Sequence, residues 1–226
     1  LFSVAGTLLL YFTLAAGFQS GAVIAAEPAS AAGASATRFA TVQRIRGEIT
    51  ATVGESGPAR TLRENDAVYV GERIRAGGSS EALLKTDDAG FIAVRPQAEF
   101  AVERFIANGN ANDQFALRLV KGGLRMITGW IGRTNRTQYR VSTLTATIGI
   151  RGTDHEPYEI SDDLAEKLAQ DEGTYDKVNR GGTTMDVGGK TLDIDPGQVG
   201  FASRPPKPAR IFWKSTASKS ACAAVA

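Results

Sequence analysis

Apolar and polar residues alternate along most of the chain from Thr41 onward, in short stretches separated by turn residues. A period of two is typical of β-strands that bury one face. Turn signals recur about every 8 to 12 residues, a spacing typical of all-β sandwiches and barrels. We therefore predict an all-β domain of many short strands, sandwich-like or a stacked β-solenoid, with at most one short helix. The expected strands are residues 41–46, 48–53, 67–70, 73–75, 81–86, 91–94, 99–106, 115–120, 124–127, 138–142, 146–150, 183–187 and 190–194.

One stretch, residues 161–169, has the spacing of a helix. It opens with Ser161, a favourable N-cap residue, and two acidic residues follow in the first turn. Leu164 and Leu168 are four residues apart, so they fall on one helical face. The pattern predicts a short helix here, with a loop as the alternative.

Composition allows one domain of ordinary size plus a targeting segment. The chain has 226 residues, of which 42% are hydrophobic and 22% charged, enough to bury a core. The net charge is +2 and the basic residues are scattered, which argues against nucleic-acid binding. Cys222 is the single cysteine, so no internal disulfide can form.

The first residues predict export. Residues 1–26 carry no charge, and the apolar run Leu1–Phe18 is followed by small residues. This is typical of a signal peptide, with cleavage expected after Ala25, Ala26 or Ala36. The alternative is a membrane anchor, which needs about 20 apolar residues. We expect residues 1–36 to be one of the two, and the missing basic start indicates a sequence truncated upstream.

The stretch from residue 146 to 156 holds the candidate chemistry. It contains the only histidine, His155, between Asp154 and Glu156. On a strand, the two carboxylates would face one side and His155 the other. Pro157 makes a turn plausible, and only a turn would bring the three together.

Arg151 lies in the same stretch, in the segment Gly149-Ile150-Arg151-Gly152-Thr153. We expect Arg151 to tie down a turn by pairing with Asp154 or nearby carbonyls, with Thr153 as a cap. An Arg151 that faces a partner is the alternative. The stretch is interpreted as a corner of the fold that can double as a docking surface. The candidate residues are Gly149, Arg151, Gly152, Thr153, Asp154 and His155.

The sequence contains few of the residue patterns that catalytic or metal-binding sites require. A metal site needs three or four ligands, and no second histidine exists. The loop Asn108–Asp113 has the residue types of a calcium loop but lacks the distal glutamate. No Gly-x-Ser-x-Gly elbow is present. We expect a non-catalytic protein without metal or cofactor; the alternative is a cell-envelope hydrolase that uses carboxylates.

Several motifs occur in the order found in the FecR domain. They are Gly47-Glu48-Ile49, Leu62-x3-Asp66-x-Val68, Gly71-Glu72-Arg73-Ile74-x2-Gly77, Asp87-Asp88-Ala89-Gly90-Phe91-Ile92-x-Val94-x-Pro96, Lys121-Gly122-Gly123-Leu124-Arg125 and Val141-x-Thr143-x-Thr145-Ala146-x-Ile148-Gly149-Ile150-Arg151-Gly152-Thr153-Asp154. Residues 41–200 thus resemble the FecR family. The resemblance implies an all-β periplasmic domain, which in the best-known members relays a signal from an outer-membrane receptor to a cytoplasmic sigma factor.

These observations predict three regions and one function. Residues 1–36 form the signal peptide or anchor, residues 38–203 a FecR-like domain, and residues 204–226 a proline-rich exit and tail. We predict a periplasmic binding or signalling module, with anchoring in the inner membrane as a variant. The expected partner is an envelope protein or a cell-wall component. A sigma-factor regulator with an upstream cytoplasmic segment is a further alternative.

Overall fold

The computed structural model describes residues 36–204, 210–213 and 221–224. The chain divides into two compact units, residues 1–34 and residues 35–226, and only the second contains described residues. The predicted signal peptide or anchor therefore lies outside the described residues, except Ala36. Most of the tail lies outside them too, and so do the side chains of Trp213 and Cys222. Among the described residues, no helix has both the length and the apolar character needed to span a membrane.

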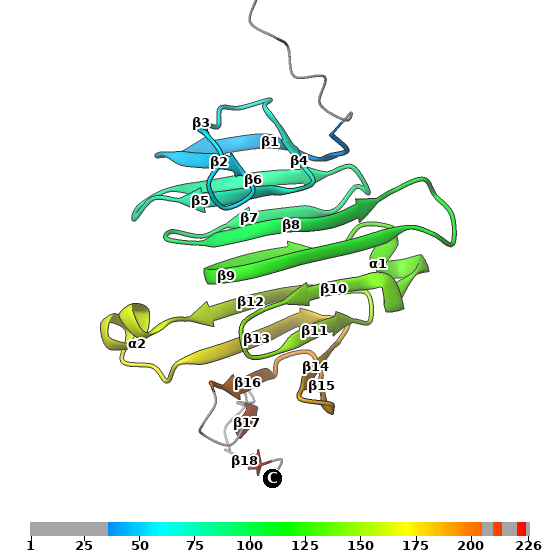
Figure 1. The fold of residues 1–226 in the computed structure, drawn as a ribbon. Helices are drawn as coiled ribbons and strands as arrows, with labels where there is room; N and C mark the ends of the chain where they lie inside the picture. Colours follow the sequence, from blue (N-terminus) through cyan, green and yellow to red (C-terminus); the bar gives the residue numbers. More distant parts are fainter. Residues whose placement is uncertain (1–35, 205–209, 214–220, 225–226) are drawn as a thin grey trace, which may run out of the picture. The chain divides into compact units, whose positions relative to one another are not determined.

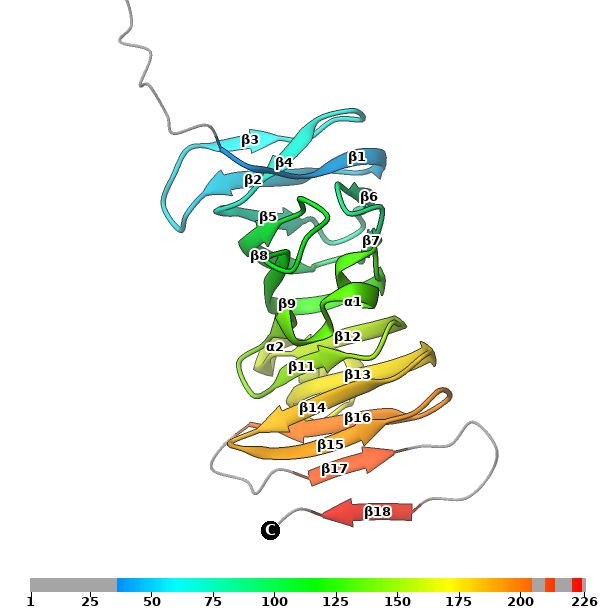
Figure 2. The ribbon, with the colours of Figure 1, turned by 90° about the vertical axis from the view of Figure 1, so that its right-hand side faces the viewer.

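The described strands form two packed sheets that share one long strand (Figures 1 and 2). In spatial order, sheet A contains β4 (Ala67–Tyr69), β1 (Arg38–Arg46), β6 (Glu81–Thr86), β7 (Phe91–Val94), β9 (Gln114–Ile127), β12 (Asp154–Ile160), β13 (Gly173–Arg180) and β16 (Val199–Ser203). Sheet B contains β3 (Ala59–Thr61), β2 (Ile49–Val53), β5 (Glu72–Ala76), β8 (Glu99–Ile106), β9, β10 (Tyr139–Ser142), β11 (Thr147–Ile150), β14 (Thr183–Val187) and β15 (Lys190–Ile194). A separate hairpin pairs β17 (Arg210–Trp213) with β18 (Ala221–Ala224).

The sequence pattern predicted two strands where the structure has the single strand β9. Its first half pairs with β8 and β10 in sheet B, and its second half pairs with β7 and β12 in sheet A. The strand passes from one sheet to the other at Gly122, where φ is +73°. A Cβ there would lie 2.7 Å from Cα of Ala98, so only glycine fits this bend. The break that the sequence predicted between residues 120 and 124 is therefore a bend within one continuous strand.

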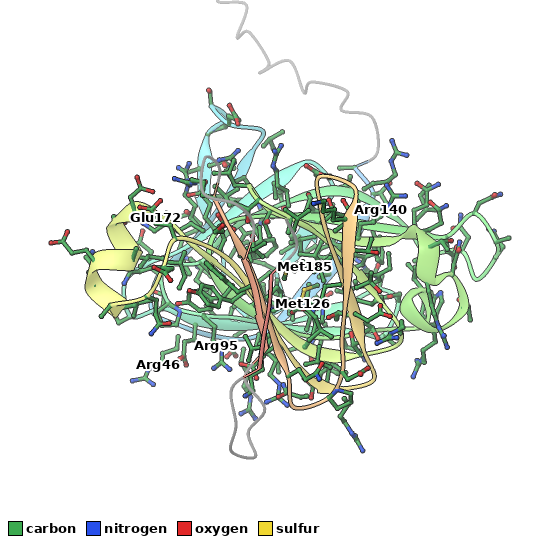
Figure 3. All side chains as sticks on the ribbon, turned by 90° about the horizontal axis from the view of Figure 1, so that it is seen from below. Arg46, Arg95, Met126, Arg140, Glu172 and Met185 are labelled. Carbon is green, nitrogen blue, oxygen red and sulfur yellow. The ribbon has the colours of Figure 1, made fainter. Side chains whose placement is uncertain are left out.

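One apolar core fills the space between the sheets. Phe39, Phe105 and Phe115 pack edge to face or at a tilt, and Tyr139 stacks on Phe115 with ring centroids 4.0 Å apart. Burial of each such side chain contributes about 1.5–3 kcal/mol. Met126 and Met185, which come from different sheets, lie near the centre of the domain in the view of Figure 3. The core ties both sheets into one domain.

The prediction of an all-β domain with few helices is confirmed, since strands account for 56% of the structure and the sheet does not close on itself. The expected helix is α2 (Asp162–Leu168). Its details differ from prediction: the hydroxyl of Ser161 donates to Asp163 instead of capping the backbone, and Leu168 is 46% exposed while Leu164 is buried. A single helical turn, α1 (Ile131–Thr134), and a 3-10 turn, η1 (Arg136–Gln138), follow β9.

Strands β12, β13 and β16 were missed by the sequence pattern. The plausible turn at Pro157 is wrong, because β12 runs straight through it. Pairing of β12 with β9 occurs on both sides of the proline, at residues 154–155 and 158–159. Proline has no N–H to donate, so it is accommodated where the ladder is interrupted.

Candidate functional site

The candidate stretch is the corner at which the chain leaves sheet B and enters sheet A. Strand β11 ends at Ile150 in sheet B, and β12 begins at Asp154 in sheet A. Gly152 takes a φ of +74° between them. The N–H of Arg151 donates to the carbonyl of Gly182 at 2.8 Å. Two sheet-to-sheet connections thus meet here, because Gly182 lies between β13 and β14.

Thr153 holds this corner through its backbone. Its N–H donates to Oγ1 of Thr128 at 3.1 Å, and its carbonyl accepts from the N–H of Thr128 at 3.0 Å. The hydroxyl of Thr153 has no hydrogen-bond partner among the described residues. The expected side-chain cap is therefore wrong, and the backbone makes the contact instead.

Because β12 is a regular strand, the candidate residues are dispersed over three environments. Asp154 and Glu156 face outward from sheet A, and His155 faces the interior. Gly149 and Arg151 lie on sheet B. The structure does not bring these six residues together.

Asp154 pairs with Arg125 and not with Arg151. Arg125 donates from Nε and Nη2 to the two carboxylate oxygens at 3.1 and 2.8 Å. The side chain of Asn179 adds a hydrogen bond of 3.3 Å. The Arg125 guanidinium is the main cause of a lowered pKa at Asp154. Asp154 is therefore an ionised partner in a bidentate pair.

Glu156 belongs to the same outward-facing network. It accepts a hydrogen bond of 2.9 Å from Asn179 and lies 3.5 Å from Arg95 and 3.8 Å from Lys177. Burial alone would raise its pKa, but the Asn179 bond and the nearby cations together lower it. Two ionised carboxylates cannot divide the roles of acid and base that a glycosidase requires.

His155 forms a fully buried pair with Asp176 on the neighbouring strand. Its Nδ1 lies 2.8 Å from Oδ1 of Asp176, and both side chains are 0% exposed. Nε2 of His155 and Oδ2 of Asp176 have no partner among the described residues. This pair is sealed inside the domain, so it holds β12 to β13.

Glu159 is a buried carboxylate that lies on the same inward face of β12 as His155. Its Oε2 accepts a hydrogen bond of 2.7 Å from Thr174, whose hydroxyl also contacts Thr143 and Thr145. Burial raises the pKa of Glu159 above the ordinary value of 4.5. The side chain is 0% exposed, which places it away from the surface grooves.

A Glu159→Gln variant should become more stable relative to the wild type as pH rises. The folded wild type holds a proton that the unfolded chain releases, so its stability falls from about pH 4.5 upward through the raised folded-state pKa. Glutamine does not titrate, so the Glu159→Gln variant lacks this pH-dependent loss of stability. Urea unfolding of both proteins from pH 4 to pH 8 measures the difference, and a pH-independent difference would contradict the assignment.

Asp88 is another buried acid with a raised pKa, again mainly through burial. It lies in the turn between β6 and β7, where Thr86 donates to its Oδ1. It is buried against Gly129, whose backbone leaves no room for a Cβ beside Asp88. Asp88 thus helps to pack the β6–β7 hairpin against the residues that follow β9.

The Asn108–Asp113 loop is organised by Asp113 from within. Its carboxylate accepts hydrogen bonds from the N–H groups of Asn108 and Gly109 at 2.7 and 2.9 Å. The half-buried indole of Trp130 donates to it at 3.1 Å. Both carboxylate oxygens of Asp113 therefore already accept hydrogen bonds from N–H groups. Across residues 36–204, no group of three or more His, Cys, Asp and Glu side chains is placed to hold a metal ion.

Arg151 extends over sheet B and pairs with the acidic residues at the end of β15. Nη2 lies 3.0 Å from Asp195, and Nη1 lies 3.5 Å from Asp193. A Cβ on Gly182 would come within 2.6 Å of the guanidinium, so the missing side chain makes room for it. The side chain of Arg151 thus pairs with Asp193 and Asp195, and neither Asp154 nor a nearby carbonyl, the two partners considered from the sequence, accepts from it among the described residues.

A groove of about 310 Å³ lies beside Arg151 on the outer face of sheet B. Its lining residues are Arg136, Thr137, Tyr139, Arg140, Thr147, Gly149, Ile150, Arg151, Thr184 and Asp186. Arg136 and Arg140 are exposed and form no ion pair with any described residue. In Figure 3, Arg140 projects from the side of the domain opposite Arg46 and Arg95. This groove therefore brings Gly149 and Arg151 together with Arg136 and Arg140.

Sequence reasoning did not single out Arg136 and Arg140. Arg140 lies between two inward-facing residues, Tyr139 and Val141, so its outward direction could be read from the alternation. Its proximity to Gly149 depends on the pairing of β10 with β11, and the groove also needs η1. Nothing local signals that placement.

Comparison with known proteins yields structural matches alone. No protein-family model and no curated protein sequence matches the chain. Two crystal structures of a protein from Parabacteroides distasonis ATCC 8503, provisionally described as an anti-sigma factor, have a similar backbone, with TM-scores of 0.49 and 0.48. Each is 12% identical over 63% of this chain. The match covers 59% of the Parabacteroides protein.

Proposed function

We propose that this chain is a non-catalytic FecR-like binding or signalling module that acts in the periplasm and recognises a protein or another cell-envelope component. The observation that carries the proposal is the sheet B groove, where Arg136 and Arg140 have no ion-pair partner among the described residues and lie beside Arg151, which is paired with Asp195. Exposed arginines are frequent anchors of binding surfaces. The order of the FecR-like motifs and the apolar start of the chain support the domain type and its export.

The longest of those motifs has a defined place in this proposal. It supplies Gly149 and Arg151 to the groove, and it also builds the corner that positions them. Arg151 is already held by Asp195, so it shapes the rim of the groove. Arg136 and Arg140 have no ion pair within the described part of the chain, so they are the candidates for pairing with a partner.

The hydrolase alternative has less support from the geometry. Asp154 and Glu156 are outward-facing and their pKa values are lowered. The carboxylates with raised pKa values, Asp88 and Glu159, are 0% exposed, and neither lines the groove. A paired acid and base at one cleft is what a glycosidase would need.

Replacement of both free arginines should abolish partner capture. The tagged full chain is crosslinked in cells, purified, and its bound components are identified, in parallel with an Arg136→Gln/Arg140→Gln variant. We expect a defined envelope component whose yield falls at least about tenfold in the variant, the loss expected when hydrogen bonds to charged groups are removed.

The matched control is Arg63→Gln, since Arg63 is exposed in the loop between β3 and β4 and does not line the groove. It should capture the partner like the wild type. Unchanged capture by the double variant would contradict a role for the groove. Turnover of cell-wall material that Asp154→Asn abolishes, with the fold intact, would contradict the non-catalytic proposal.

A further inference from the structure

We infer that the sheet B groove binds an oxyanion, a phosphate or carboxylate group carried by its partner; this inference rests on the proposed function. Three arginines and one acid line the groove. Arg136 and Arg140 lack acidic partners among the described residues, whereas Arg151 is paired with Asp193 and Asp195 beside the groove. The acid, Asp186, lies at the β14–β15 hairpin, where its Oδ1 accepts the N–H of Gly189 at 3.3 Å.

The shape of the groove depends on Gly149. This residue lies in the middle of sheet B, directly opposite Arg140 on β10 and Thr184 on β14. A Cβ at Gly149 would meet only the carbonyl of Thr184, at 3.9 Å. Its backbone is extended within β11, so the fold does not require glycine there. The glycine leaves a bare floor in the groove, and the half-buried Thr147 on the same strand adds a hydroxyl to the lining.

The walls of the groove are held in place before any ligand arrives. Tyr139, which precedes Arg140, is 2% exposed and stacks on Phe115 in the core. Arg151 lies across Gly182 and is held by Asp193 and Asp195. The backbone that carries Arg140 is therefore fixed, while the exposed side chains of Arg136 and Arg140 are ordered only when the ligand binds.

The chemistry of these donors selects the ligand class. A guanidinium presents a planar fork of N–H donors that matches the oxygens of a phosphate or carboxylate, and it remains charged at all physiological pH values. The groove is an open depression of about 310 Å³ on the surface of sheet B, so most of a bound carrier would remain in solvent. The groove therefore suits one anionic group and its immediate carrier.

The test is a titration of the isotope-labelled full chain with sodium phosphate and, separately, with sodium acetate at constant ionic strength. Backbone amide shifts of Gly149 and Thr184 report binding. We expect saturable shifts with at least one anion, and the stronger of the two identifies the source as phosphate or carboxylate. Arg140→Gln should weaken binding about tenfold or more.

Gly149→Leu supplies a second test that leaves every charge in place. Its side chain should fill the floor and abolish the shifts, while thermal unfolding shows that the fold is retained. Arg63→Gln should bind like the wild type. The inference is overturned if neither anion gives saturable shifts, if Gly149→Leu binds normally, or if Arg63→Gln loses as much affinity as Arg140→Gln.

The two proposals can fail separately. If neither anion binds but partner capture still depends on Arg136 and Arg140, the binding function stands and the oxyanion inference is wrong. If an anion binds at the groove but no envelope component is captured, the groove is an anion site, and both the proposed function and the claim that a partner carries the anion are wrong.

Discussion

Replacement of Gly181 by alanine should destabilise the domain by about 2–4 kcal/mol, the sum of an unfavourable backbone conformation and a forced clash. Gly181 has a φ of +79° in the connection between β13 and β14. A Cβ there would lie 1.9 Å from the carbonyl oxygen of Gly152. Neither atom belongs to a flexible side chain, so the two sheet-to-sheet corners would have to separate. Equilibrium urea unfolding of wild type and variant measures the loss.

Gly149→Ala is the matched control on the same sheet. Gly149 has an extended backbone and open space above it, so alanine should be neutral or stabilise the domain by about 0.5–1 kcal/mol. Equal effects of the two substitutions would contradict the corner geometry, because they would show that backbone conformation and space do not distinguish these positions.

Replacement of His155 by phenylalanine should cost about 1–3 kcal/mol, the usual effect of leaving a buried hydrogen-bonding group without its partner. Phenylalanine keeps most of the volume but removes the nitrogen that lies 2.8 Å from Asp176. The carboxylate would remain 0% exposed without its hydrogen-bond partner. Urea unfolding at neutral pH measures the free energy.

The double variant His155→Phe/Asp176→Leu shows whether the cost arises from the orphaned carboxylate. Replacing both members of a buried pair with apolar residues of similar volume is often neutral. The double variant should therefore be more stable than His155→Phe alone. If it is less stable by the sum of the two single effects, the pair does not act as a unit.

Strands with regular alternation could be predicted from the sequence, and those with polar interiors could not. In β6, β7 and β8, apolar residues occupy the inward positions, and their predicted bounds agree with the structure. In β12 the inward positions hold His155, Pro157 and Glu159. Buried polar residues reverse the expected pattern, because their burial depends on partners such as Asp176 that come from another strand.

The candidate stretch shows the same limit of local reasoning. Of the two glycines near Arg151, Gly152 correctly indicated a corner, because it adopts a positive φ, whereas Gly149 is extended within β11. The partner of Arg151 was predicted as Asp154 or nearby carbonyls, but the corner turns the Asp154 carboxylate onto sheet A toward Arg125. Asp193 and Asp195 reach Arg151 through the β14–β15 hairpin. Only the sheet topology specifies those distant partners.

The central claim is that the partner binds at the sheet B groove, and site-specific photocrosslinking in cells tests it most directly. A photoreactive residue is placed at Thr147, which lines the groove, and separately at Lys167, which is exposed on α2. The account predicts a discrete crosslinked product from position 147, lost when Arg136 and Arg140 are replaced, and none from position 167. A product from position 167 alone, or one from position 147 that survives the arginine replacements, would contradict it.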